Sequence, residues 1–350
     1  DLVKMVYYMT PAALPHFNQS IGVRAELMAL GELMATRLGC AYLQARGLDV
    51  GWLDARELLR SIESARKDTS ASYLAAGCDF ASDQDLQNRL SGHPRILLTQ
   101  GFIASNQAGE TVLLGRGGSD TSASYLAAKL QSCGLEIWTD VPGIFSADPR
   151  VVTGACQLRA LSYREAQEIS SAGGSVLHPR CLSPLRQHRI PLRIRCTNQP
   201  ELAGTLVASD LGGDAPGVKA IAGRTGITLI SMETLGMWHE VGFLADAFRC
   251  FSDLGLSIDL VSTSESNVTV TLDTGAHAID AATLGQLEER LKRLCRVRIV
   301  KGAEIVSLVG RKIRSVLHEI GPAMEVFEEH RIHLVSQAAS DLNLSFVVGQ

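Results

Sequence analysis

The chain lacks the features that mark membrane, nucleic-acid-binding and disulfide-rich proteins. None of its apolar runs approaches the roughly 20 residues that a membrane span needs. Its 33 Lys and Arg residues against 37 Asp and Glu residues give a net charge of −4, with no basic run that could bind nucleic acid. Its 8 cysteines form no Cys-x-x-Cys pair and have no His spacing suited to zinc. These absences predict a cytoplasmic protein with reduced thiols, no bound metal in a dedicated site, and neither nucleic acid nor membrane as a partner.

What is present favours a protein of several domains that acts on small molecules. With 350 residues, of which 46% are hydrophobic and 20% charged, the chain can form two or three domains with real cores. It opens at Asp1, in a stretch without a clear strand pattern. We interpret that opening as a missing beginning.

The first 210 residues alternate between apolar strands and helical segments. Strands are expected over 50–53, 95–103, 110–114 and 135–140, and helices over 22–39, 54–65, 122–131 and 162–172. This alternation predicts a layered α/β domain with a largely buried sheet. In the first helix, Leu27, Leu30, Met34 and Leu38 form one apolar stripe, and Gly39 is a plausible stop.

An internal repeat follows a short stretch rich in Gly, Asp and Pro. Leu-Val-Ser at 260–262 recurs at 334–336, and Asn-Val-Thr-Val at 267–270 has its counterpart at 343–346. Each copy has the order strand, helix, strand, strand, which is typical of a ferredoxin-like α+β module. We therefore expect a first domain over 1–208, a linker over 209–217, and modules over 218–298 and 299–350. The second module ends one helix and one strand short of a complete copy.

The most informative segment is Gly-Arg-Gly-Gly-Ser-Asp at 115–120, between an expected strand and an expected helix. Free backbone N–H groups and the helix dipole favour an anion at such a place. The segment is neither a Walker A loop nor a dinucleotide fingerprint. Arg116 could hold a carboxylate and Asp120 an ammonium group, which suits a zwitterionic substrate. A tight turn in which Asp120 or Thr121 caps the helix explains the same residues equally well.

A second polar segment covers 138–150. Thr139 and Asp140 come at the carboxyl end of an expected strand, where open α/β sheets bind ligands. Arg150 follows Asp148 and Pro149 and places a cation in an expected turn. Asp-Pro is, however, also common in ordinary turns. The two segments together favour a ligand site over simple turns.

These segments, with Gly-Glu-Leu-Met at 31–34 and Val-Leu-His-Pro at 176–179, resemble the aspartate kinases of the amino-acid kinase superfamily. The likeness extends through nearly the whole chain, because two ACT modules follow the catalytic domain in that family. It is nearest to the kinase half of the aspartokinase and diaminopimelate decarboxylase fusions. The resemblance implies an amino-acid kinase-like layered α/β domain, truncated at its N-terminus, followed by two ferredoxin-like ACT modules.

The resemblance also implies an activity. The enzyme would transfer the γ-phosphate of ATP, with Mg²⁺, to the β-carboxylate of L-aspartate and so form 4-phospho-L-aspartate. This is the first step of lysine, threonine and methionine biosynthesis, with feedback by lysine through the ACT modules of a homodimer. Threonine, or no effector, stays open as an alternative. Another acylphosphate-forming kinase, such as one acting on glutamate, is disfavoured by the paired ACT modules.

The resemblance assigns residues to three sites. Aspartate would be bound by Glu32, Arg116, Gly117, Ser119 and Asp120, of which Arg116 and Asp120 would be catalytic. The nucleotide site would contain Thr139, Asp140, Phe145, Asp148, Arg150 and Ser175. The effector site would contain Met237, Gly242, Phe243, Leu244, Ala245, Ser257, Asp259, Thr263, Ser264 and Glu265. Plain packing is the alternative for the effector segments, and helical periodicity alone places Glu32 opposite the leucine stripe, on a solvated face.

Two departures from the family concern cations of the phosphate site. The sequence contains no Lys-Phe-Gly-Gly-Thr-Ser segment, and Ser175 stands where the family usually has lysine. The loss of both lysines predicts that this chain is a weak or inactive kinase. The alternative function is therefore a catalytically impaired fragment, or a regulatory protein that binds amino acids without phosphoryl transfer.

Overall fold

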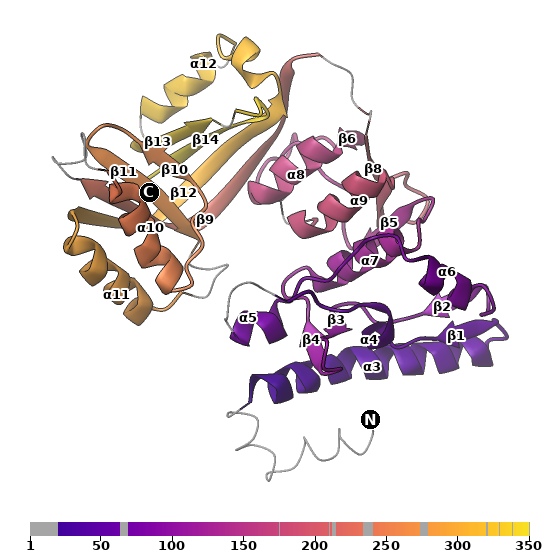
Figure 1. The fold of residues 1–350 in the computed structure, drawn as a ribbon. Coiled ribbons are helices and arrows are strands. Elements are labelled where there is room, and N and C mark those ends of the chain that lie inside the picture. The colour runs from indigo at the N-terminus through magenta and orange to yellow at the C-terminus, as the bar shows by residue number, and fades with distance from the viewer. Residues whose placement is uncertain are drawn as a thin grey trace. The chain divides into compact units, whose positions relative to one another are not determined.

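The computed structural model describes residues 20–63, 69–174, 176–209, 211, 215–233, 241–273, 279–319, 321–328, 330–337 and 339–349. The chain divides into two compact units, which are described separately (Figure 1). The first unit falls within 1–144, 159–170 and 175–212, and the second within 145–158, 171–174 and 213–350. The expected site residues Ser175 and Met237, and much of the expected linker, lie outside the described residues.

The first unit is an α/β structure, as predicted. Its helices are α3 (Ile21–Ala45), α4 (Ala55–Leu58), α5 (Thr69–Leu74), α6 (Gln84–Leu90), α7 (Gly118–Lys129), α8 (Tyr163–Ser171) and α9 (Leu182–His188). Its strands are β1 (Val50–Trp52), β2 (Ile96–Leu98), β3 (Ile103–Ser105), β4 (Thr111–Leu113), β5 (Leu135–Thr139), β6 (Ala160–Ser162), β7 (Leu192–Cys196) and β8 (Thr205–Ala208). They form a parallel pair β1-β2, an antiparallel pair β3-β4 and a mixed sheet of order β5-β7-β8-β6.

The expected strand over 95–103 is in fact two strands separated by a bend. Phe102 has a φ of 71°, and a Cβ atom on Gly101 would lie 2.9 Å from Ser119 Oγ. The bend therefore follows from the close approach of this backbone to the start of α7. Apolar content alone cannot reveal such an approach.

The buried face of α3 differs from the expected leucine stripe. Met34 is 50% and Leu38 73% exposed, whereas Ala25 and Ala29 are fully buried and pack with Ile103 and Leu113 of the β3-β4 pair. Small alanines allow the helix to approach the strands closely, so Met34 and Leu38 of the expected stripe face outward, whereas Leu30 is buried at 7% exposure. The helix also continues through Gly39 to Ala45, so the expected stop at Gly39 was wrong.

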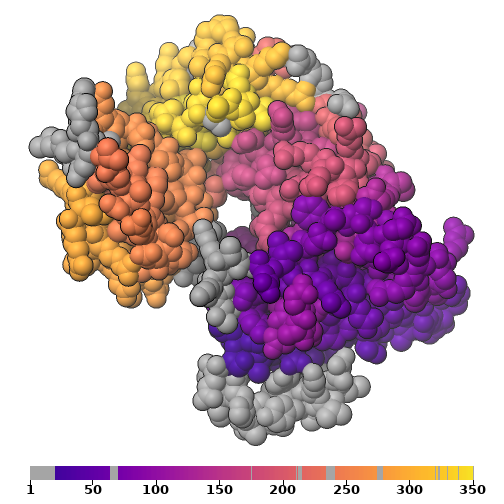
Figure 2. Space-filling view, in the orientation of Figure 1, coloured from indigo at the N-terminus to yellow at the C-terminus, as the bar shows by residue number. Residues whose placement is uncertain are grey.

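The second unit contains one six-stranded antiparallel sheet of order β10-β11-β9-β12-β14-β13. Its elements are β9 (Gly217–Glu233), α10 (Phe243–Asp253), β10 (Val261–Thr263), β11 (Asn267–Asp273), α11 (Ala281–Lys292), β12 (Arg296–Arg311), the 3₁₀ turn η3 (Ile313–Val316), α12 (Gly321–Met324), the 3₁₀ turn η4 (Glu325–Glu328), β13 (Ile332–Gln337) and β14 (Asn343–Val348). In the space-filling view the last of these elements form the yellow surface (Figure 2). No helix among the described residues is both long and apolar enough to cross a membrane.

The sequence repeat appears in this sheet as two hairpins of identical register. Val261 pairs with Val270 in β10-β11, and their counterparts Val335 and Phe346 pair in β13-β14. The long strands β9 and β12 run through both copies, because the first half of β9 pairs with the second half of β12. The expected boundary at 298–299 falls inside β12, so the two copies share one continuous sheet.

Candidate functional site

The glycine loop connects β4 to α7 and leaves the start of the helix open. Gly115 and Gly117 have φ values of 73° and 65°, which favour glycine. The helix begins at Gly118, four residues earlier than expected, so Ser119 and Asp120 lie in its first turn. Its N-cap is Gly117, without a side-chain cap, and the Thr121 hydroxyl donates back to the Gly117 carbonyl at 2.8 Å. The interpretation of Asp120 or Thr121 as the cap was therefore wrong.

His178 lies directly against this loop. A Cβ atom on Gly117 would be 2.3 Å from His178 Cβ, so only glycine fits there. His178 begins the 3₁₀ turn η2 (Pro179–Cys181), and its Nδ1 accepts a hydrogen bond of 3.3 Å from the Arg180 backbone N–H. Burial lowers the pKa of His178, and the charges of Arg180 and Arg116 lower it further. The imidazole is therefore neutral at pH 7 and adds no charge beside Arg116.

Arg180 also fixes the start of the loop. Its guanidinium donates to the Leu114 carbonyl at 2.7 Å and to the Ala76 carbonyl at 2.9 Å. These charge-assisted bonds connect the end of β4 to the segment that follows α5. The loop is thus fixed by groups distant in the sequence.

Asp120 is half-buried beneath His178. Burial raises the pKa of its carboxyl group, and a hydrogen bond from the His178 backbone partly offsets that rise. Because a buried carboxylate lacks hydration, a ligand cation would stabilise its charged form strongly. Burial also raises the pKa of the neighbouring Cys181, which is therefore an unreactive thiol.

Arg116 and Ser119 are the exposed members of the loop. Among the residues that the structure describes, no carboxylate pairs with Arg116. Its guanidinium, the open end of α7 and the Asp120 carboxyl group thus belong to a single turn of chain. That turn offers donors for a carboxylate and an acceptor for an ammonium group.

Glu32 lies on the inner side of α3, not on a solvated face. It is half-buried, and the next residue, Leu33, is 3% exposed in the core that contains Ile103 and is flanked by Phe102. The solvated position expected from periodicity was wrong because it assumed that the leucine stripe is buried. A role for Glu32 in binding aspartate stays a prediction.

Thr139 is the last residue of strand β5, as expected, and Asp140 follows it directly. The Thr139 carbonyl accepts hydrogen bonds from the Thr197 backbone N–H at 2.8 Å and the Thr197 hydroxyl at 3.0 Å. The Thr139 hydroxyl donates to Asp140 Oδ1 at 3.1 Å, and Asp140 is exposed. These bonds fix the backbone and leave the carboxylate accessible, while its nucleotide role stays a prediction.

Three further residues of the expected nucleotide site, Phe145, Asp148 and Arg150, belong to the second unit. Asp148 Oδ1 accepts a hydrogen bond of 2.9 Å from the Arg150 backbone N–H, an ordinary turn interaction. Phe145 forms a β-bridge with Gln157, and the Ser146 carbonyl accepts a hydrogen bond of 2.7 Å from Ile221 of β9. Phe145, Asp148 and Arg150 therefore belong to a folded loop, and their role in a nucleotide site stays a prediction.

The expected effector residues lie on two exposed turns of the second unit. Gly242, with a φ of 107°, is the N-cap of α10, and the next residues, Leu244 and Ala245, are exposed. Phe243 is buried in the core with Phe251, so its side chain packs and only its backbone is open to a ligand. Ser257, Thr263, Ser264 and Glu265 are exposed.

Asp259 faces a guanidinium group from β9. Arg224 Nη1 lies 3.8 Å from Asp259 Oδ2 and 3.3 Å from Asp273 Oδ2. The Asp259 carboxylate thus already has a cationic neighbour. Its expected role in binding an effector stays a prediction.

Sequence reasoning missed His178 and Arg180, which support the loop, and Gln100, which connects α3 to the start of α4. His178 belongs to a noted motif but had no role, and the contact between Arg180 and Ala76 spans 104 residues. Gln100, 1% exposed, accepts from the Ala55 N–H at 2.8 Å and donates to the Thr36 hydroxyl at 2.7 Å. Pattern and periodicity carry no signal for such long-range contacts.

No metal centre is built into the part of the chain that the structure describes. Within it, no group of three or more His, Cys, Asp or Glu side chains is placed to hold an ion. Any divalent cation would therefore have to bring further ligands, such as phosphate oxygens, with it.

Comparison with known proteins places this site in a family. Residues 4–196 match the sequence profile of the amino acid kinase family. The chain is 36% identical to lysine-sensitive aspartokinase 3 of Escherichia coli strain K12 over 325 residues, which are 92% of this chain and 71% of that protein.

Two solved structures have the same fold. The structure of E. coli aspartokinase III with aspartate and ADP, in the R-state, has a TM-score of 0.82 at 35% identity, covering 94% of this chain and 73% of that one. The structure of that enzyme with lysine and aspartate, in the T-state, has a TM-score of 0.73 at 35% identity, covering 94% and 72%. The chain therefore belongs to the aspartokinases of the amino acid kinase family.

Proposed function

We propose that the chain binds L-aspartate at the glycine loop and takes part in its phosphorylation by ATP. The observation that carries this proposal is the open N-terminus of α7, where exposed Arg116 and half-buried Asp120 lie in one turn beside His178. A related aspartokinase of known structure contains aspartate and ADP, which supports the proposal.

The two charges of an amino acid fit this turn. The α-carboxylate would be held by Arg116, Ser119 and the N–H groups at the start of α7. The ammonium group would pair with Asp120, whose raised pKa makes a cation a favourable partner. Gly117 would allow the backbone to approach the substrate, and Glu32 would complete the site from α3.

The proposed reaction brings together two anions, the β-carboxylate of aspartate and the triphosphate of ATP. A β-carboxylate oxygen of aspartate attacks the γ-phosphorus of ATP, the bond to the β-phosphate oxygen breaks, and ADP leaves. The protein contributes position and charge neutralisation, because phosphoryl transfer needs little covalent help. The nucleotide would be bound by Thr139, Asp140, Phe145, Asp148, Arg150 and Ser175. Mg²⁺ would enter with the triphosphate and neutralise its charge.

A second function is favoured by a specific feature of the sequence. Ser175 stands where the family usually has lysine. Without that cation the chain would bind amino acids but transfer phosphate slowly. We infer that the chain retains amino-acid binding even where phosphoryl transfer is slow.

Regulation is the third part of the proposal. The two β-sheet copies would act as ACT modules of a cytoplasmic homodimer, with lysine bound at the turns around Gly242 and Ser264. A lysine-sensitive relative supports this assignment. Calorimetric titration with lysine should show binding to the chain and at least ten-fold weaker binding to Asp259→Asn; equal binding would contradict it.

The kinase proposal is tested by a hydroxylamine trap for 4-phospho-L-aspartate, with ATP-Mg²⁺ and either L-aspartate or L-glutamate. Product that forms with aspartate alone supports the proposed reaction. Calorimetric binding of aspartate or lysine without product supports the regulatory alternative, and the absence of both product and amino-acid binding contradicts both.

A further inference from the structure

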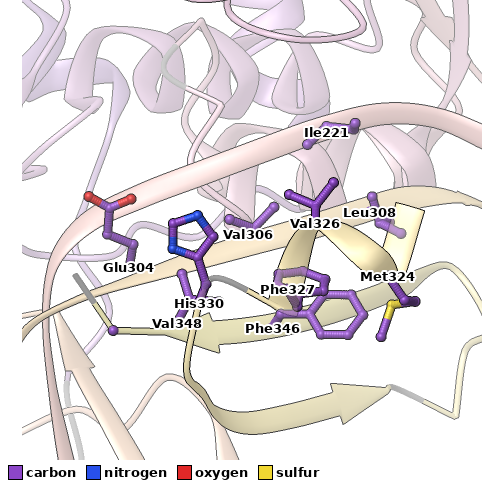
Figure 3. A pocket seen from close by; sticks show the side chains of 11 residues that line it. Ile221, Glu304, Val306, Leu308, Met324, Val326, Phe327, His330, Phe346 and Val348 are labelled. Atoms are coloured by element: carbon purple, nitrogen blue, oxygen red, sulfur yellow. The ribbon is translucent and has the colours of Figure 1, made fainter. Parts of the chain in front are cut away.

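A buried amide directly precedes the bend that contacts the start of α7. Gln100 is 1% exposed. Buried side chains are usually apolar, as in the second unit, where Phe327 and Phe346 lie side by side in a cavity (Figure 3). A buried amide loses its hydration, so it is stable only where the protein supplies hydrogen bonds. The partners of Gln100 therefore indicate its role.

Both hydrogens and the oxygen of this amide are bonded. Its Oε1 accepts from the Ala55 backbone N–H at 2.8 Å, at the start of α4. Its Nε2 donates to the Leu53 carbonyl at 3.3 Å and to the Thr36 hydroxyl at 2.7 Å. The backbone N–H can only donate and the carbonyl can only accept, so the amide has one possible orientation. Segments distant in the sequence thus meet at Gln100.

The Thr36 hydroxyl extends this network to Glu32. It donates to the Glu32 carbonyl at 2.8 Å, one turn earlier on α3. It accepts from Trp52 Nε1 at 3.1 Å as well as from Gln100. Its hydrogen and both of its lone pairs are therefore used. The turn of α3 that contains Glu32 is thus fixed to the segment that contains Gln100.

The residues that follow the amide contact the first turn of α7. A Cβ atom on Gly101 would lie 2.9 Å from Ser119 Oγ. The Phe102 N–H donates to Ser122 Oγ at 3.2 Å, and that hydroxyl donates to the Ser119 carbonyl at 2.8 Å. Phe102 also packs against the core that α3 shares with β3 and β4. One short segment therefore contacts both helices.

The backbone of Phe102 indicates that this arrangement is enforced. Its φ of 71° is a left-handed conformation, which is unfavourable for a residue with a Cβ atom. Such strain persists only where surrounding contacts fix the backbone, and it is common at binding sites. Gln100 fixes the chain before Phe102, and the Ser122 hydroxyl fixes it at Phe102 itself. The segment 100–102 is thus a rigid spacer between α3 and α7.

We propose that Gln100 is a positioning residue of the aspartate site. Its amide holds α3 against the segment 100–102 and so sets the separation between Glu32 and the first turn of α7. Glu32 and Arg116 then contact the same substrate molecule in a preformed site, which strengthens binding. The identity of the substrate rests on the proposed function, whereas the link between α3 and α7 is a property of the chain alone.

Thr36→Val tests the link with the smallest change. Valine keeps the shape of threonine but lacks the hydroxyl that joins Gln100 to Glu32, and Thr36→Ser restores that hydroxyl. Gln100→Met breaks the same link from its other end, and Thr36→Val carries the test if Gln100→Met does not fold. Gln87→Met is the matched control, because the Gln87 amide also donates to a backbone carbonyl of the first unit, that of Lys129 at 3.0 Å.

The first measurement is calorimetric titration of the full chain with L-aspartate. Thr36→Val and Gln100→Met should bind aspartate at least five-fold more weakly than the wild type, whereas Thr36→Ser and Gln87→Met should stay within two-fold of it. In a Glu32→Gln background Thr36→Val should have no further effect, because the hydroxyl acts through Glu32. Unchanged affinity in Thr36→Val, or a loss that adds in full to that of Glu32→Gln, would overturn the proposal.

The second measurement needs no substrate. Amide hydrogen exchange of the full chain, followed by mass spectrometry, reports the local opening of α3 and α7. Thr36→Val should raise exchange at least five-fold over 32–37 and over 118–122 together, and Gln87→Met should change neither. Faster exchange over 32–37 alone would overturn the link. Joint exchange in a chain whose wild type binds no aspartate would support the link and contradict the proposed function.

Discussion

His178 Cβ lies where a side chain on Gly117 would have to go, at 2.3 Å from the position of a Cβ atom on that glycine. The contact presses the η2 turn onto the loop that opens α7. The shape of the loop therefore depends on His178, which lies 61 positions after Gly117 in the sequence. The proposed aspartate site therefore depends on a packing contact as well as on its charged groups.

Replacing Gly117 by alanine tests this contact. Gly109→Ala is the matched control, because Gly109 has a similar φ of 80° but nothing within 4 Å of its Cβ position. The control should cost about 1 kcal/mol of unfolding free energy for the left-handed backbone. Gly117→Ala should cost a further 1–3 kcal/mol, roughly, for the clash. Urea unfolding that shows equal costs would contradict the contact.

Replacing Asp120 by asparagine should stabilise the chain while it removes aspartate binding. Burial raises the pKa of the folded carboxyl group above the ordinary value of 3.8. The folded state then binds more protons than the unfolded state between those two values, so its stability falls as pH rises through that window. Asparagine avoids this loss and can still accept the His178 hydrogen bond.

The check is chemical denaturation of both proteins from pH 4 to pH 8. The advantage of Asp120→Asn should be smallest at pH 4 and reach its full size above the raised pKa. An advantage that is independent of pH would show that desolvation of the carboxylate is not its cause.

His178 should make the chain less stable in mild acid. Burial holds its folded pKa below the ordinary value of 6.5, so the unfolded state binds more protons between the two values. The contribution to stability is complete above pH 6.5 and is lost as pH falls through that window. In His178→Asn, which keeps an acceptor at the N-cap, stability should fall less between pH 7 and pH 5. His93→Asn, at an exposed histidine, should follow the wild type.

Arg180 should be more important for stability than its charge suggests. Arg180→Met removes both guanidinium bonds and leaves the Leu114 and Ala76 carbonyls without them. We expect a loss of about 3 kcal/mol in unfolding free energy. Arg186→Met, at an exposed position of α9, should cost less than about 0.5 kcal/mol. Similar losses for both would contradict the anchoring role.

The sequence predicted those features that depend on local patterns. The strand before the glycine loop, the position of Thr139 at a strand end and the two hairpins of the repeat follow from alternation, turn residues and self-similarity. The resemblance to a family came from short motifs at four places in the chain. Each of these motifs and patterns is only a few residues long, although the motifs and the two copies of the repeat are far apart in the chain.

Features that depend on distant contacts were missed or misjudged. Met34 and Leu38 look like core residues, but the close packing of Ala25 and Ala29 on the strands turns them outward. The break at Gly101 requires knowledge of Ser119, and the role of Arg180 requires knowledge of Ala76. The extended pairing of β9 with β12 likewise joins two distant segments, so no local pattern marks the shared sheet.

The most direct test of the central claim is calorimetric titration of the chain and its Arg116→Lys variant with L-aspartate, and with succinate, which lacks the ammonium group. Arg164→Lys, at an exposed arginine of α8, is the matched control. If the glycine loop holds the two charges of the substrate, aspartate binds the wild type and the control equally. It should then bind Arg116→Lys at least ten-fold more weakly, because lysine cannot form the bidentate contact, and succinate should bind the wild type at least ten-fold more weakly than aspartate. Equal aspartate affinity for all three proteins would contradict the account.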